Sequence, residues 1–243
     1  MTHPMKVRTL ATSILQNQAE LKACQHKFLL YLLQLWLGMS DRYNFVNMAR
    51  YVDFVESTYR NNFAQPANFL GINLELARDN LSRDLVLAFD PSFLPKSGKY
   101  TDGAGRFWSG CAGKAKKGTE FSGIAAIDLE DKTALHLLAV QTVERHKGET
   151  LLDYYASILT INREERSEVS PDVVAGAYFS RKPFVDQLLV SNFHLVSRLR
   201  TNVHLRYLYA GPKENHPGAP PSSMAGLIPV ICGTIFYAML PGS

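Results

Sequence analysis

The pattern of apolar residues changes near residue 80. Before it, apolar residues recur at helical spacing, and the dense apolar segment 21–37, followed by Gly38, predicts a buried helix. After it, short apolar runs alternate with polar loops, as expected for strands. The predicted order is strands 85–89, 106–112, 119–129 and 134–143, helix 151–163, strand 173–177, helix 183–190 and strand 193–199. This order favours an α/β domain in layers.

Two short helices are predicted over residues 45–52 and 55–63. With Arg50, Tyr59 and Arg60, the pair fits a helix-turn-helix that touches DNA. Two short amphipathic helices fit a simple helical bundle just as well. We therefore expect residues 1–80 to form a helical region, with DNA binding as one of two interpretations.

The composition is that of an ordinary globular protein. Of 243 residues, 46% are hydrophobic and 20% are charged, which argues against a disordered chain. The formal charge of +4 is compatible with a nucleic-acid partner but does not indicate one. Cys24, Cys111 and Cys232 have no metal-binding spacing, and the N-terminus carries no secretory signal. We expect a reduced, cytoplasmic protein.

Basic residues gather in the segment 96–117, which contains a single acid, Asp102. They could form a solvated face, or they could contact the phosphates of a nucleic acid. Trp108 lies among them and is expected to pack within a strand, with stacking on DNA bases as the alternative. The lysines that could contact phosphate are Lys96, Lys99, Lys114, Lys116 and Lys117.

Asp90 directly follows the predicted strand 85–89. An aspartate at the end of a buried strand projects from the edge of the sheet, where α/β proteins build their sites, and there it could hold a divalent cation. In the other interpretation, Asp90 caps a turn made by Pro91 and Ser92. Spacing alone does not separate the two.

Several blocks of the sequence resemble the DDE transposases of bacterial insertion sequences, in that family's order and spacing. The blocks are FDPSFLPKSGKYTDGAGRFWSGCAGKAKKG (89–118), GIAAIDLEDKTALHLLAVQT (123–142), VVAGAYFSRKPFVDQL (173–188) and FHLVSRLRTNVHLRYLY (193–209). The resemblance implies a ribonuclease H-like mixed sheet with flanking helices over residues 81–212. It also implies three carboxylates that bind two Mg²⁺ ions for DNA cleavage and strand transfer.

By this resemblance, Asp90 matches the family's first metal-binding aspartate. Gly176 stands where the family has the second, and glycine supplies no ligand. Asp172 lies on the same predicted strand but roughly 13 Å away, too far to replace it. Arg198 and Arg200 match positions beside the second metal, where the family context directs them to the DNA backbone.

The last part of the sequence also departs from the family. Residues 215–243 contain no Asp, Glu, Lys or Arg, so they offer no third carboxylate. The abrupt loss of charge indicates a reading-frame change close to Gly218, and we expect a truncated copy with an aberrant tail over 213–243. A rival interpretation makes residues 224–240 a membrane anchor. Pro229 and the lack of flanking basic residues disfavour it, so no membrane association is expected.

Three functions compete for this sequence. The first is an insertion-sequence transposase, expected to be catalytically defective because one of three carboxylates is left. The second is a non-catalytic DNA-binding protein that competes for transposon ends, and the third is a pseudogene product. The expected partners are transposon-end DNA and either a second copy of the chain, as a homodimer, or intact transposase copies.

Overall fold

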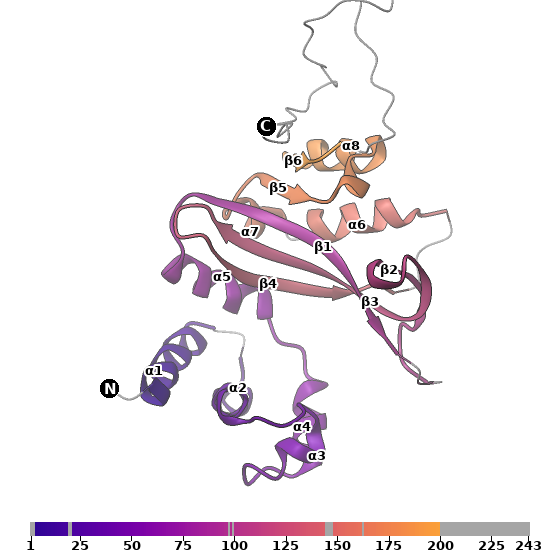
Figure 1. The fold of residues 1–243 in the computed structure, drawn as a ribbon. Helices are drawn as coiled ribbons and strands as arrows, with labels where there is room; N and C mark the ends of the chain where they lie inside the picture. The colour runs from indigo at the N-terminus through magenta and orange to yellow at the C-terminus, as the bar shows by residue number, and fades with distance from the viewer. Residues whose placement is uncertain are drawn as a thin grey trace, which may run out of the picture. The chain divides into compact units, whose positions relative to one another are not determined.

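The computed structural model describes residues 3–18, 21–96, 98, 100–143, 148–161 and 163–199 (Figure 1). The chain divides into two compact units, Met1–Ser82 and Arg83–Ser243. Each unit has its own helices or strands. Lys99, Arg200 and the tail expected over 213–243 lie outside the described residues.

The described residues of the first unit form helices joined by short turns. Asn44 and Asn68 begin two of them, because their side chains accept hydrogen bonds of 2.9 Å from the backbone N–H groups of Asn47 and Gly71. The helices are α1 (His3–Gln16), α2 (Ala23–Gly38), α3 (Phe45–Met48), α4 (Glu56–Phe63) and α5 (Phe69–Asn80).

The core of this unit is built on the apolar side of α2, as the dense apolar segment predicts. Tyr59 belongs to this core, with 1% of its surface exposed, and its hydroxyl donates a 3.4 Å hydrogen bond to the carbonyl oxygen of Met48. Tyr59 is therefore not available to DNA, and its part in the helix-turn-helix interpretation is wrong. The core residues are Leu15, Phe28, Leu29, Leu32, Leu35, Met39, Met48 and Tyr59.

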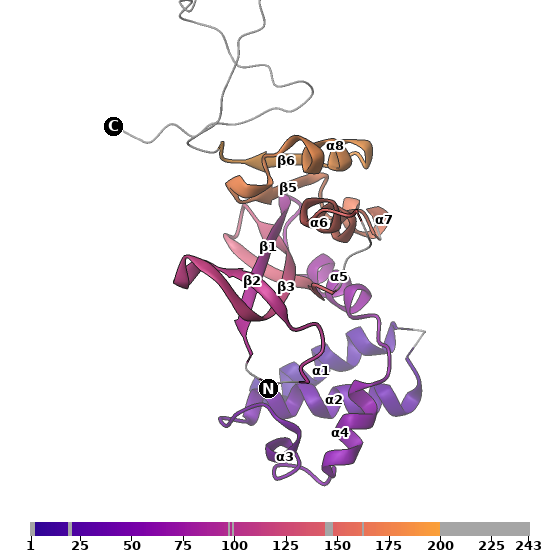
Figure 2. The same ribbon diagram turned by 90° about the vertical axis from the view of Figure 1, so that its right-hand side faces the viewer.

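The second unit is built on a mixed sheet of six strands (Figures 1 and 2). The strands are β1 (Leu85–Pro95), β2 (Gly105–Ser109), β3 (Lys114–Asp128), β4 (Thr133–Gln141), β5 (Asp172–Ala175) and β6 (His194–Ser197). The helices are α6 (Leu151–Thr160), α7 (Arg163–Ser167) and α8 (Lys182–Val190), with single 3₁₀ turns η1 (Gly110–Ala112) and η2 (Ala177–Phe179).

The order of the strands defines the fold. β4, β3 and β1 are antiparallel neighbours, and β1 then pairs in parallel with β5, which pairs in parallel with β6. Helices α6 and α8 lie in the connections that the parallel strands require. Strand β2 pairs antiparallel with the first residues of β3 and forms one edge of the sheet. Three antiparallel strands followed by two parallel ones is the arrangement of a ribonuclease H-like domain, so the predicted fold class is confirmed.

The core of the second unit lies between one face of the sheet and helices α6 and α8. Leu87 and Phe89 on β1 are 0% and 1% exposed. The ring of Phe89 packs edge-on against Tyr155 of α6 at 5.9 Å between centroids, and it lies 6.3 Å from Phe184 of α8. Because side chains alternate along a strand, the residue after Phe89 projects from the opposite face.

Candidate functional site

Asp90 lies within strand β1 and not beyond its end. The sequence predicted a strand that stops at Phe89, but β3 is long enough to pair with every residue of β1, from Leu85 opposite Asp128 to Pro95 opposite Gly118. Asp90 stands opposite Gly123 in this ladder. The expectation that Asp90 follows the strand, and with it the turn-cap interpretation, is therefore wrong.

The parallel neighbour of β1 ends beside Asp90. The last pair between β1 and β5 joins Phe89 to Ala175, so the next residues on the two strands are Asp90 and Gly176. Asp90 is exposed to solvent, yet the surrounding protein removes part of the water around its carboxylate. This desolvation raises the pKa of Asp90 above its ordinary value.

A row of three residues crosses the sheet where the parallel pairing of β1, β5 and β6 stops. Ala175 of β5 pairs with Phe89 on one side and with Ser197 of β6 on the other. The residues that follow these three are Asp90, Gly176 and Arg198, and Arg198 is exposed. Two strand spacings place Arg198 roughly 10 Å from Asp90. We name Asp90, Gly176 and Arg198 the strand-end row.

The backbone does not require glycine in the middle of this row. Gly176 has φ −64° and ψ 163°, which any residue adopts. A Cβ atom at this position would meet nothing within 4 Å. A side chain at position 176 would therefore meet no steric obstacle at its Cβ atom.

The residues of the row do not fit a pair of Mg²⁺ ions. Asp90 is the only carboxylate among the row's three residues, and Gly176 supplies no ligand. Asp172, four residues before Gly176, faces His194, whose Nδ1 lies 3.2 Å from its Oδ1. Within the described part of the chain, no group of three or more His, Cys, Asp or Glu residues could hold a metal ion.

A second set of predicted residues gathers on the ribbon formed by β2 and β3, which Figure 2 shows beside the main sheet. In its register, Arg106 pairs with Lys117 and Trp108 pairs with Ala115. The lysines of this ribbon are all exposed: Lys114, Lys116 and Lys117. Lys96, just past the end of β1, is exposed as well.

Trp108 contradicts the expectation that it packs within the sheet. Its side chain is 64% exposed, and that of Tyr100 is 92% exposed. The prediction treated Trp108 as a core residue because aromatic residues favour strands. β2 is an edge strand, however, and pairs with β3 on one side only.

A buried carboxylate was missed by the sequence analysis. Glu120 on β3 is 5% exposed, and its Oε1 accepts hydrogen bonds from Tyr155 at 2.6 Å and from Thr142 at 2.9 Å. The signal available was the alternation of β3, in which Glu120 shares the inward face with Ile124. These bonds give Glu120 a structural part in joining β3 to α6.

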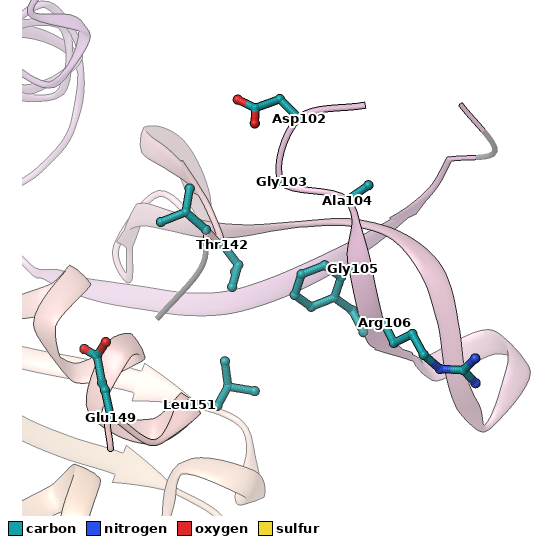
Figure 3. Close-up of a pocket in the computed structure, with 10 residues that line it drawn as sticks. Asp102, Gly103, Ala104, Gly105, Arg106, Thr142, Glu149 and Leu151 are labelled. Carbon is teal, nitrogen blue, oxygen red and sulfur yellow. The ribbon is translucent and has the colours of Figure 1, made fainter. Parts of the chain in front are cut away.

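A cavity of about 780 Å³ opens between the β2 side of the sheet and the start of α6. Figure 3 shows Asp102 and Glu149 at separate ends of this cavity and Arg106 directed away from it. The cavity is lined by these three charged residues together with apolar side chains such as Phe107, Val143 and Leu151.

Comparisons with known families and with curated proteins find no match for this chain. Among solved structures, the chain is similar to a Mos1 mariner paired-end complex with Mn, at 12% identity, TM-score 0.25 and coverage of 67% of this chain and 56% of that one. It is also similar to a piggyBac transposase synaptic complex with hairpin DNA, at 13% identity, TM-score 0.34 and coverage of 87% and 46%.

The chain thus spans about half the length of these two proteins. At TM-scores this low, the likeness establishes neither a shared fold nor a shared function, and the ribonuclease H-like assignment rests on the order of the strands. No described helix is both long enough and apolar enough to cross a membrane.

Proposed function

We propose that this chain is a DNA-binding protein of the insertion-sequence transposase lineage that does not itself catalyse strand transfer. The observation that carries the proposal is the strand-end row, in which Asp90 and Arg198 flank a glycine. A two-metal phosphoryl-transfer centre needs several carboxylates around its ions. The row supplies one, while the cations beside it suit a phosphate backbone.

In this proposal, the basic residues hold the DNA. Lys114, Lys116 and Lys117 are exposed, and among the residues described none of them has a carboxylate oxygen within 4 Å of its ammonium group. Ammonium groups without acidic partners are free to replace the counterions of a nucleic acid. Arg198 would add a contact at the strand-end row.

Salt-dependent binding tests this function. A duplex from the DNA that flanks the coding sequence, as the candidate transposon end, and a random duplex are titrated by fluorescence anisotropy at several salt concentrations. Affinity should fall steeply with salt, and replacing the three ribbon lysines by alanine should reduce the slope of log K against log salt by about 2–3. Lys182→Ala is the matched control, because Lys182 is exposed but forms an ion pair with Asp186.

Catalysis is tested separately on the same DNA with Mg²⁺ or Mn²⁺. We expect no strand transfer from the natural chain. Activity that disappears in Asp90→Ala would overturn the catalytic half of the proposal, and failure to bind either duplex would overturn the DNA-binding half. A preference for the candidate end over random DNA would support the transposase lineage.

A further inference from the structure

The most exposed feature of the β2–β3 ribbon is an indole ring. Trp108 is 64% exposed, and within the described chain no aromatic ring or cation stacks on it. A large aromatic side chain left in water forgoes the stabilisation that burial would give it. An exposed aromatic ring offers a face on which the base of a nucleic acid can stack.

The side chains that share a face with Trp108 indicate what kind of partner would bind there. Residues paired across antiparallel strands share a face, so Trp108 and Ala115 lie on the same face as Arg106 and Lys117. The small side chain of Ala115 leaves the indole uncovered by its cross-strand neighbour. Both cations are exposed, and among the described residues neither has a carboxylate oxygen within 4 Å. A flat ring with two cations beside it on one side suits a partner that carries both flat rings and negative charge.

Asp90 lies on the same face of the sheet as Trp108. Side chains alternate along β3, so Ala115, Lys117 and Gly123 lie on one face, and Gly123 stands opposite Asp90. From Ala115 to Gly123 the strand rises roughly 26 Å. This length corresponds to roughly seven or eight nucleotides of a strand at about 3.4 Å each. One DNA segment could therefore contact both places.

We infer that Trp108 is a stacking platform for an unpaired DNA base, with Arg106 and Lys117, the neighbouring cross-strand pair, holding phosphates on one side of it. The inference rests on the proposed DNA-binding function and adds the form of DNA that is bound. An indole can stack only on a base whose face is free, as in a single-stranded end or an extruded nucleotide. The grooves of an intact duplex offer no such face.

The test compares two DNAs and isolates one fluorophore. The DNAs are a blunt duplex and the same duplex with a three-nucleotide unpaired 3′ end. The chain has two tryptophans, so Trp36→Phe leaves Trp108 as the only indole. We expect the unpaired end to quench Trp108 fluorescence and to bind about 5- to 100-fold more tightly than the blunt duplex, as one base stacked on an aromatic ring predicts.

The variants separate stacking from charge. Trp108→Ala should abolish the preference for the unpaired end and leave the affinity for blunt duplex unchanged, while Trp108→Phe should keep part of the preference. Lys117→Ala should reduce the affinity for both DNAs by a similar factor.

The outcomes distinguish the inference from the proposed function. Blunt-duplex binding without a Trp108-dependent preference overturns the inference and leaves DNA binding in place. Loss of self-association in Trp108→Ala, with both DNA affinities unchanged, would assign the indole to contact with a second copy and also overturns the inference. Absence of binding to both DNAs overturns the proposed function and this inference together.

Discussion

The hydroxyl of Ser197 donates a hydrogen bond of 3.1 Å to the carbonyl oxygen of Gly176. This bond ties the end of β6 to the residue that follows β5 and holds Gly176 in an extended conformation. A side chain placed at 176 would thus project from a fixed backbone beside Asp90. The strand-end row can be changed there without disturbing the fold.

Gly176→Asp should create a metal-binding pair. The new carboxylate would stand about one strand spacing, roughly 5 Å, from Asp90, close enough for the two to share a divalent cation. Without metal, repulsion between the two carboxylates should lower the melting temperature slightly. We expect Mn²⁺ to raise the melting temperature of this variant by several degrees and to leave the natural chain unchanged.

Gly176→Asn is the control for this change, because it adds a similar volume without charge. It should respond to Mn²⁺ no more than the natural chain does. Equal responses in the Asp and Asn variants would contradict the idea of a vacant carboxylate position.

Asp90→Asn should flatten the dependence of stability on pH. Desolvation raises the pKa of Asp90 above its ordinary value of 3.8, so the folded state holds this proton more tightly than the unfolded chain does. That contribution is fully present below the ordinary pKa and is lost as the pH rises through the folded value. At pH 7 the Asn variant should be the more stable, by less than about 1 kcal/mol because the group is partly solvated.

Urea denaturation at several values between about pH 3 and pH 7 measures this difference. Parallel stability curves for the two proteins would show that Asp90 is not desolvated in the folded chain.

Tyr155→Phe should destabilise the second unit. It removes a 2.6 Å hydrogen bond to Glu120, a carboxylate with 5% exposure, and leaves Thr142 as the remaining hydroxyl donor described here. Removing a hydrogen bond to a buried charged group costs about 1.5–3 kcal/mol. Tyr154→Phe is the control, since its hydroxyl donates to the neutral carbonyl oxygen of Gln141 at 3.0 Å. Equal losses of unfolding free energy in the two variants would count against a special part for Glu120.

Gly118→Ala should cost about 1–3 kcal/mol through overpacking. A Cβ at Gly118 would lie 2.3 Å from the carbonyl oxygen of Leu94, at the point where β3 passes from β1 to β2. Gly123→Ala is the matched control on the same strand, because its Cβ would meet the nearest atom, the carbonyl oxygen of Asp90, at 3.6 Å. Chemical denaturation of both variants measures the difference, and a loss of similar size at both positions would refute the steric explanation.

Much of the order of elements in the second unit could be predicted from the sequence, because strands such as β1 and β5 contain short apolar runs between polar segments. The helix predicted from residue 151 does begin there, after Thr150, whose hydroxyl accepts a 3.2 Å hydrogen bond from the backbone N–H of Asp153 in α6. The far half of β1 could not be predicted. Pro91 and Pro95 interrupt the local pattern, and the strand forms there only because β3 supplies a distant partner.

In the candidate site, too, features set by the local sequence could be predicted and features set by distant strands could not. Asp90 was found because an acid that follows an apolar run is a local signal, and the resemblance singled out Gly176 and Arg198. That the three lie in one row depends on register between distant strands. Trp108 was misjudged because its local sequence is that of any strand, and only the sheet order shows that β2 is an edge. Glu120 was missed because the hydroxyl groups that bind it come from segments far along the chain.

The parallel pairing of Phe89 with Ala175 also bears on how the protein folds. The antiparallel strands β1, β3 and β4 are consecutive or nearly so and can assemble early, while β5 joins β1 only after β2, β3, β4, α6 and α7 have intervened. Distant pairings of this kind form slowly, because the entropy of closing a long loop must first be overcome. Until the ribosome has delivered α6 and α8, Leu87 and Phe89 remain uncovered, and during that interval the nascent chain is open to aggregation or chaperone capture.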